Sequence, residues 1–123
     1  MHELSVCQAL LAQVIDIAVS RGASAVKRIT IEVGPLSGIE PALLASAFET
    51  LRSGSCAAQA VLSIEAPAVM VRCMSCDAQT SPEPNRLVCA VCGEFRTRVV
   101  AGDELRLRRV ELRVPESLPA SVN

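Results

Sequence analysis

The sequence predicts an α+β fold: a small domain of two helices and a three-stranded sheet, with a zinc-ribbon domain inserted into it. Two segments carry apolar residues at helical spacing, and three others alternate apolar and polar residues as half-buried strands do. Between the second and third of those strands lie two C-x2-C pairs, Cys73–Cys76 and Cys89–Cys92. The chain has 123 residues, of which 50% are hydrophobic, and this length suffices for one ordinary domain or two very small ones.

The first predicted element is an amphipathic helix over residues 4–20. Gly22 follows it as a stop signal. The apolar stripe of this helix consists of Leu4, Cys7, Leu11, Val14, Ile15 and Ala18. Because Cys7 lies on this stripe, we interpret it as a small buried hydrophobe and not as a reactive thiol.

A strand, a loop, a second helix and another strand follow. Residues 26–34 alternate as a strand, and residues 34–38 (Gly-Pro-Leu-Ser-Gly) form a loop. Pro41 suits the first position of a helix that runs to about residue 53. One face of that helix is lined by Leu43, Leu44, Ala47, Phe48 and Leu51. Residues 60–66 form the next strand.

The last predicted strand, residues 104–114, changes the face of its apolar residues partway. Leu105 and Leu107 have one parity, and Val110, Leu112 and Val114 have the other, which predicts a bulge or a bend. We therefore expect a discontinuous α/β domain made of residues 1–66 and 101–114, a zinc ribbon over residues 67–100, and a mobile tail over residues 115–123.

The two C-x2-C pairs, separated by twelve residues, are the clearest chemical signal in the chain. Two such turns can aim four thiolates at one ion and complete a closed tetrahedral site. We interpret Cys73, Cys76, Cys89 and Cys92 as ligands of a structural Zn²⁺. The same thiolates could hold one iron, and spacing does not separate the two metals. A thioredoxin-like redox pair is a further alternative, although neither pair opens a helix after a buried strand.

Charge and composition argue against several classes of protein. Lys plus Arg is 12 and Asp plus Glu is 13, and the chain has two Phe and no Trp or Tyr. This balance argues against binding nucleic acid by bulk charge or by base stacking. Charges interrupt the apolar stretches well short of the ~20 residues that span a bilayer, and the start lacks the pattern of a signal peptide. We expect a cytoplasmic protein with reduced thiols and no membrane or nucleic-acid partner.

The N-terminus carries the only histidine, His2, between Met1 and Glu3. Near the first turn of a helix the dipole disfavours the imidazolium ion, and this favours the neutral imidazole that binds metals. The α-amino group of Met1, the imidazole and nearby backbone nitrogens form a nitrogen-rich set that suits Ni(II) or Cu(II). The ordinary interpretation of Glu3 is a partner of the helix dipole.

Several motifs together resemble the HypA/HybF family of nickel-insertion proteins, which mature nickel–iron hydrogenase. They include Met1-His2-Glu3-Leu4-Ser5, residues 33–38, Ala47-Phe48-Glu49, the two C-x2-C pairs and Gly102-Asp103-Glu104-Leu105. The resemblance covers the chain to about residue 114. One departure is Ala90, where some relatives have proline after the first cysteine of the second pair.

This resemblance implies a metallochaperone and not an enzyme. It implies that His2 is the essential ligand of transiently bound Ni²⁺, with Glu3 and backbone nitrogens beside it, and that the four cysteines hold zinc. In some relatives an acidic residue near position 40 adjoins the nickel site, which here points to Glu40. The implied partners are a nickel-handling GTPase, the hydrogenase large subunit and, in some bacteria, the urease accessory proteins.

The residues alone also leave a second interpretation open. A zinc ribbon is common in interaction modules and nucleic-acid-binding modules, and Arg106, Arg108 and Arg109 belong to a cluster that could form a basic strip. The near-neutral net charge and the lack of aromatic residues count against the nucleic-acid version of this alternative.

Overall fold

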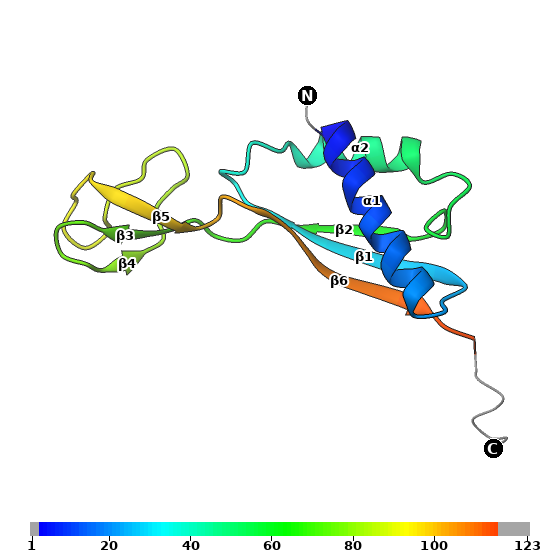
Figure 1. Cartoon of the computed structure of the whole chain (residues 1–123). Helices are drawn as coiled ribbons and strands as arrows, with labels where there is room; N and C mark the ends of the chain where they lie inside the picture. Colours follow the sequence, from blue (N-terminus) through cyan, green and yellow to red (C-terminus); the bar gives the residue numbers. More distant parts are fainter. Residues whose placement is uncertain (1–2, 116–123) are drawn as a thin grey trace, which may run out of the picture. The chain divides into compact units, whose positions relative to one another are not determined.

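The structure, a computed structural model, describes residues 3–115 and contains two helices and six strands in that range (Figure 1). In chain order these elements are α1 (Glu3–Ser20), β1 (Ala25–Val33), α2 (Pro41–Leu51), β2 (Val61–Glu65), β3 (Met70–Cys73), β4 (Gln79–Thr80), β5 (Thr97–Ala101) and β6 (Leu105–Arg113). The strands form two three-stranded sheets, ordered β2-β1-β6 and β4-β3-β5. The predicted fold class is confirmed. The expected tail falls, from residue 116 onward, outside the described residues.

The chain divides into two compact units. Unit 1 comprises the chain up to Thr30, Ala42–Ser63 and the chain from Leu107 onward. Unit 2 comprises Ile31–Pro41 and Ile64–Arg106, and it includes all four clustered cysteines.

The core of unit 1 is aliphatic apart from Phe48 and lies under the two helices. Both helices lie on the same side of sheet β2-β1-β6 (Figure 1). Residues buried on α1 recur every three or four positions, as one face of a helix requires: Cys7, Leu10, Leu11, Val14 and Ala18. Cys7 is 2% exposed, so the prediction of a buried Cys7 is confirmed. Leu4 is 50% exposed, so the buried stripe begins at Cys7 and not at Leu4.

By length and composition α1 is long and apolar enough to cross a membrane, with a mean hydropathy of 1.4 over 18 residues. The core helix of a soluble protein meets the same criteria. Here the stripe that contains Leu11 and Val14 is buried, and Asp16 lies on the exposed side. These features fit the amphipathic core helix that the sequence predicts.

The second helix ends at Leu51, slightly before the expected residue 53. Directly after the helix, the guanidinium of Arg52 donates to the carbonyls of Ala58 at 2.9 Å and Ala60 at 2.7 Å in the loop before β2. The same group lies 4.7 Å above the ring of Phe48. These contacts hold the loop that leads into β2, and they explain why the chain turns here.

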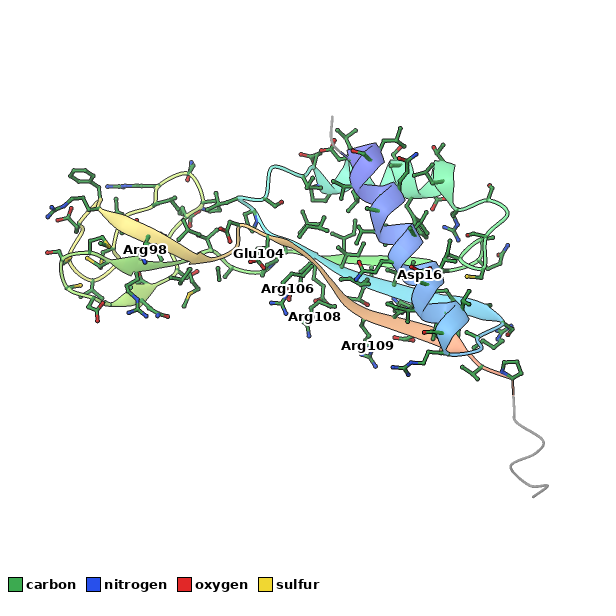
Figure 2. The ribbon with its side chains drawn as sticks, viewed as in Figure 1. Asp16, Arg98, Glu104, Arg106, Arg108 and Arg109 are labelled. Carbon is green, nitrogen blue, oxygen red and sulfur yellow. The ribbon has the colours of Figure 1, made fainter. Side chains whose placement is uncertain are left out.

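The predicted change of parity in β6 is confirmed. Arg108 and Arg109 are consecutive and both exposed, whereas Leu107 before them and Val110 after them are half-buried. Figure 2 shows both arginines projecting from β6 on the side away from α1. Two adjacent residues on one face are what a bulge produces.

In unit 2, the loop after β1 lies directly against the turn before β6. The amide of Gly34 donates to the carbonyl of Glu104 at 2.9 Å, and that of Leu36 donates to the carbonyl of Gly102 at 2.8 Å. A Cβ atom on Gly34 would overlap the Gly102 carbonyl, and one on Gly102 would lie 2.8 Å from the Cα of Val69. Only glycine fits at either position.

Candidate metal centre

The centre is built on β3, the middle strand of the second sheet. Val71 is fully buried, and it pairs with Thr80 of β4 on one side and Val99 of β5 on the other. Cys73 is the last residue of β3 and is 1% exposed. The strand therefore holds the first cysteine rigidly in the core of the ribbon.

The first C-x2-C turn, which we call knuckle 1 (residues 73–76), wraps its backbone around the sulfur of Cys73. The amides of Ser75 and Cys76 donate to the Cys73 Sγ at 3.2 and 3.3 Å. The amide of Asp77 then donates to the Cys73 carbonyl at 3.1 Å, which closes the turn. Asp77 takes a φ of 65°, the left-handed conformation that such a closure needs.

The second turn, knuckle 2 (residues 89–92), repeats this geometry. The amides of Val91 and Cys92 donate to the Cys89 Sγ at 3.3 and 3.4 Å. The amide of Gly93, at a φ of 79°, closes the turn onto the Cys89 carbonyl at 2.9 Å. The glycine that the sequence places after knuckle 2 thus has the backbone role that Asp77 has after knuckle 1.

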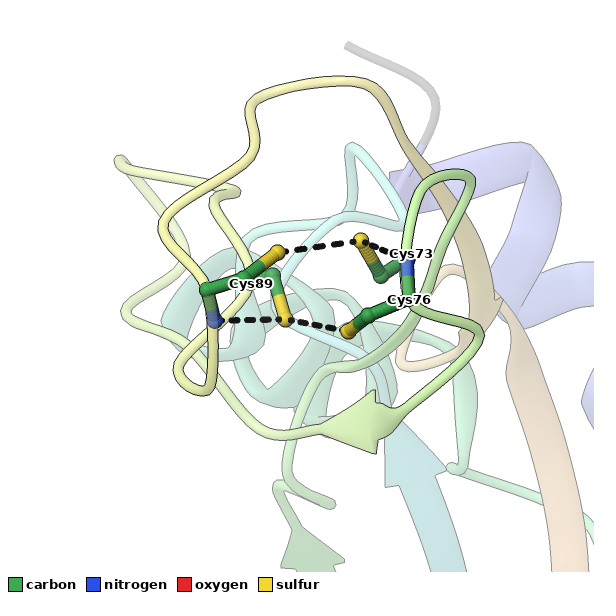
Figure 3. Close-up of side chains that lie close together, drawn as sticks. Cys73, Cys76 and Cys89 are labelled. Atoms are coloured by element: carbon green, nitrogen blue, oxygen red, sulfur yellow. Dashed lines mark hydrogen bonds between the residues drawn. The ribbon is translucent and has the colours of Figure 1, made fainter.

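The two knuckles bring four sulfur atoms together (Figure 3). The Sγ atoms of Cys73 and Cys92 are 3.6 Å apart, as are those of Cys76 and Cys89, and all four lie within 4.8 Å of one another. A tetrahedron of thiolates with Zn–S bonds of ~2.3 Å has S···S edges of ~3.8 Å. The spacing of the four sulfur atoms is therefore close to that of a tetrahedral Zn²⁺ site.

The thiol pKa values show which sulfurs ionise first. The Cys92 amide, followed by other donors, lowers the pKa of Cys89 to about 6, and the Cys76 amide likewise lowers the pKa of Cys73. The pKa of Cys92 is subject to opposing effects. The Glu94 amide lowers it, whereas the hydrogen bond between the Cys92 S–H and the Cys73 Sγ, together with desolvation, raises it to about 12. Each knuckle thus has one thiol whose pKa is lowered, Cys73 or Cys89, and one whose pKa is raised, Cys76 or Cys92. A bound divalent cation would favour the thiolate form of all four.

The site has a buried and an exposed side. Cys73 and Cys89 are buried, whereas Cys76 and Cys92 are exposed. Four thiolates fill the coordination sphere of zinc and leave no position for a substrate. The arrangement is suited to holding the two halves of the ribbon together and not to catalysis at the metal.

Three polar contacts that the sequence does not reveal support knuckle 2 and the chain on either side of it. Thr80 Oγ1 accepts the Ala90 amide at 3.2 Å, and Thr97 Oγ1 donates to the Leu87 carbonyl at 2.9 Å. Glu94 accepts the Arg96 Nε at 3.0 Å, which lowers the pKa of this carboxyl. Threonine and glutamate are too common in strands and turns for their presence alone to have predicted these roles.

The residues predicted to hold nickel are described only in part. Met1 and His2 lie outside the described residues. Glu3 opens α1 in unit 1 and is 6% exposed, and it has an interaction partner. Glu40 is exposed in unit 2, one residue before the start of α2. Within residues 3–115, one group of three or more His, Cys, Asp or Glu side chains is placed to hold a metal ion, and it consists of the four clustered cysteines.

Comparison with known proteins identifies relatives over nearly the whole chain. Residues 1–112 match the model of the family described as "Hydrogenase/urease nickel incorporation, metallochaperone, hypA". The hydrogenase maturation factor HypA of Nitrosospira multiformis is 41% identical over 112 residues, which cover 91% of this chain and 97% of the relative. That of Aquifex aeolicus is 35% identical over 114 residues, which cover 93% and 99% respectively.

Solved structures agree with these matches. The solution structure of the Ni metallochaperone HypA from Helicobacter pylori matches with a TM-score of 0.69 at 30% identity, covering 94% of this chain and 100% of that one. A second solution structure of a HypA protein matches with a TM-score of 0.72, also at 30% identity, and covers 94% and 98%.

Proposed function

Because the chain belongs to the HypA family of hydrogenase and urease nickel-incorporation metallochaperones, we propose that it binds Ni(II) at its N-terminus and delivers it to the large subunit of nickel–iron hydrogenase. The observation that carries this proposal is the family match, which begins at residue 1 and so includes Met1, His2 and Glu3. Delivery of an ion is transport of cargo, and we propose no catalytic activity for the chain.

The nickel site we propose uses donors from the first residues alone. The imidazole of His2, the α-amino group of Met1 and nearby backbone nitrogens are the donors that Ni(II) prefers, with the carboxylate of Glu3 beside them. Glu40 is a further proposed neighbour of this site. Ligands at a chain terminus hold an ion where another protein can reach it, and ligand exchange to a partner requires such access.

We propose a structural role for the cysteine site. Cys73, Cys76, Cys89 and Cys92 would hold Zn²⁺, and the ion would supply the crosslink that keeps knuckle 1 and knuckle 2 together. The fit of the four sulfurs to a zinc tetrahedron supports this role. Units of this size seldom bury enough apolar surface to fold without a metal or disulfides.

We propose two partners in the cytoplasm: a nickel-handling GTPase and the hydrogenase large subunit. The family's description names urease as well as hydrogenase, so urease accessory proteins are a third proposed partner. None of these proposals requires a membrane or a nucleic acid.

A metal-transfer assay tests the proposed function. Zinc-loaded protein carrying nickel is mixed with nickel-free hydrogenase large subunit, and the metal content of each protein is measured after separation. We expect nickel to move to the large subunit from the native protein and not from the His2→Ala variant, which should carry none. Transfer that is equal for free nickel, native protein and His2→Ala would contradict the proposal.

A further inference from the structure

The net charge of −1 conceals opposite charges on the two units. Among residues 3–115, unit 1 has seven basic side chains and four acidic ones: Arg21, Lys27, Arg28, Arg52, Arg108, Arg109 and Arg113 against Glu3, Asp16, Glu49 and Glu111. In the same range unit 2 has five basic and eight acidic side chains: Arg72, Arg86, Arg96, Arg98 and Arg106 against Glu32, Glu40, Glu65, Asp77, Glu83, Glu94, Asp103 and Glu104. Unit 1 therefore has an excess of three basic side chains, and unit 2 an excess of three acidic ones.

Most of the positive charge of unit 1 comes from two adjacent strands, β1 and β6. Their unit 1 portions, residues 25–30 and 107–113, hold five basic residues and one acidic residue, Glu111. We call the five basic residues the basic surface: Lys27, Arg28, Arg108, Arg109 and Arg113. All five are exposed.

Contacts show that the members of the basic surface are neighbours in space. Arg28 of β1 and Arg109 of β6 share the carboxylate of Glu111, at 3.9 and 3.7 Å. Lys27 and Arg113 line the same hollow of about 300 Å³, together with Gln59. Arg108 and Arg109 project from β6 on one side, away from α1 (Figure 2). The basic surface thus contains two groups of neighbours, Arg28 with Arg109 around Glu111 and Lys27 with Arg113 at the hollow, on adjacent strands of one sheet.

The one acidic residue in these two segments cannot neutralise the basic surface. Arg28 and Arg109 approach Glu111 only at the long end of the ion-pair range, and their side chains are 44% and 71% exposed. Exposed ion pairs of this kind contribute little free energy, so either arginine can readily pair with another carboxylate instead. Even without Arg108, which has an interaction partner of its own, the four other basic residues face one carboxylate, so the surface keeps a surplus of positive charge that an incoming carboxylate can meet.

We propose that the basic surface is a docking site for an acidic protein surface, with the hollow beside Lys27 and Arg113 receiving one of its Asp or Glu side chains. Charge complementarity is the argument for this partner: Lys27 and Arg113 bring one ammonium and one guanidinium group to the lining of the hollow, and the Gln59 amide adds a further donor. The chemistry of unit 1 favours a protein over a nucleic acid, because its one aromatic residue, Phe48, is buried and cannot stack on a base. This docking does not depend on nickel binding.

The test uses the full-length, zinc-loaded protein and poly-L-glutamate as the acidic polypeptide. Binding is measured for the wild type and for two paired variants, Arg28→Gln/Arg109→Gln and Lys27→Gln/Arg113→Gln. The matched control is Arg86→Gln/Arg98→Gln, which removes the same charge from exposed residues of unit 2. Zinc content and circular dichroism establish that each variant is folded, and a DNA duplex is tested in parallel.

We expect wild-type binding that weakens as NaCl is raised from about 50 to about 200 mM. Each pair of substitutions in the basic surface should weaken binding by at least about tenfold at the lower salt, and the unit 2 pair by less than about twofold. Equal losses in all three variants would overturn the proposal, because they would reveal an effect of bulk charge alone. Tighter binding to the DNA duplex than to poly-L-glutamate would also overturn the proposal. So would salt-sensitive self-association that the two paired substitutions in the basic surface abolish, because either result assigns the surface another occupant.

Discussion

The backbone of Gly34 lies so close to the carbonyl of Gly102 that a Cβ atom on Gly34 would overlap it, and the backbone of Val69 likewise leaves no space for a Cβ atom on Gly102. The Gly102 carbonyl accepts the Leu36 amide at 2.8 Å, and this bond holds the loop after β1 against the turn before β6. Both glycines belong to motifs that mark the family resemblance, residues 33–38 and 102–105. The structure gives the physical reason for them: the two motifs pack against each other within unit 2.

Replacing Gly34 with alanine should destabilise the protein. The new methyl group would overlap the Gly102 carbonyl, which is backbone and cannot rotate away. We expect a loss of about 3 kcal/mol in the free energy of unfolding, measured by urea denaturation. Gly38→Ala is the control, because Gly38 has a φ of 81° and open space around it, and should lose only about 1 kcal/mol. An equal loss of unfolding free energy in Gly34→Ala and Gly38→Ala would show that the close contact between Gly34 and the Gly102 carbonyl does not limit the side chain at position 34.

The residues that close the two knuckles should respond in opposite ways to substitution. Asp77 has a φ of 65°, so Asp77→Gly removes the steric cost of a side chain in that conformation and should raise stability by up to about 1 kcal/mol. Its ion pair with Arg72, at 3.6 Å and largely exposed, contributes little against this gain. Gly93→Ala introduces the same cost at a φ of 79° and should lower stability by about 1 kcal/mol. Thermal unfolding in excess zinc measures both, and a destabilised Asp77→Gly variant would refute the strain argument.

Loss of one zinc ligand should unfold the ribbon and spare unit 1. In Cys76→Ser, we expect zinc to be lost and amides of β3 and β5 to exchange rapidly with deuterium, because the ion no longer joins the two knuckles. Cys56→Ser is the matched control, since Cys56 lies in unit 1 away from the cluster. Full zinc content and unchanged exchange in Cys76→Ser would argue against a structural metal.

Nickel affinity should fall on acidification. An imidazole binds metal only in its neutral form, so protons compete with nickel for His2 as the pH falls through the range in which imidazole titrates. Nickel retained after dialysis at a series of pH values, with zinc measured in the same samples, gives the profile. A nickel content that stays constant across this range would show that imidazole is not a ligand.

Periodicity predicted the larger elements because one face of each is buried. α1, α2 and the sheet β2-β1-β6 follow the helical and alternating patterns, and the change of exposed face at Arg108 and Arg109 agrees with the change of parity in the sequence. The boundaries were less predictable where a distant contact decides them. The loop after α2 is held by Arg52, which donates to the carbonyls of Ala58 and Ala60, and no local sequence pattern predicts those two contacts.

The spacing of the cysteines predicted which sulfurs come together, because each C-x2-C turn fixes its own pair. What the sequence did not indicate is how the turns are supported. The contact between Thr80 and the Ala90 amide joins residues ten positions apart through the fold. The opposite charges of the two units also could not be predicted from the sequence, because the segments of unit 1 alternate with those of unit 2 along the chain. Only the folded arrangement shows that a nearly neutral chain has one basic and one acidic unit.

The most direct test of the proposed function is a calorimetric nickel titration of untagged, zinc-loaded protein with its native N-terminus, beside His2→Ala. We expect the native protein to bind about one Ni(II) per chain and His2→Ala to lose this binding while keeping its zinc and its fold. The same nickel affinity in both proteins would overturn the proposed nickel site, because His2 would then not be an essential ligand.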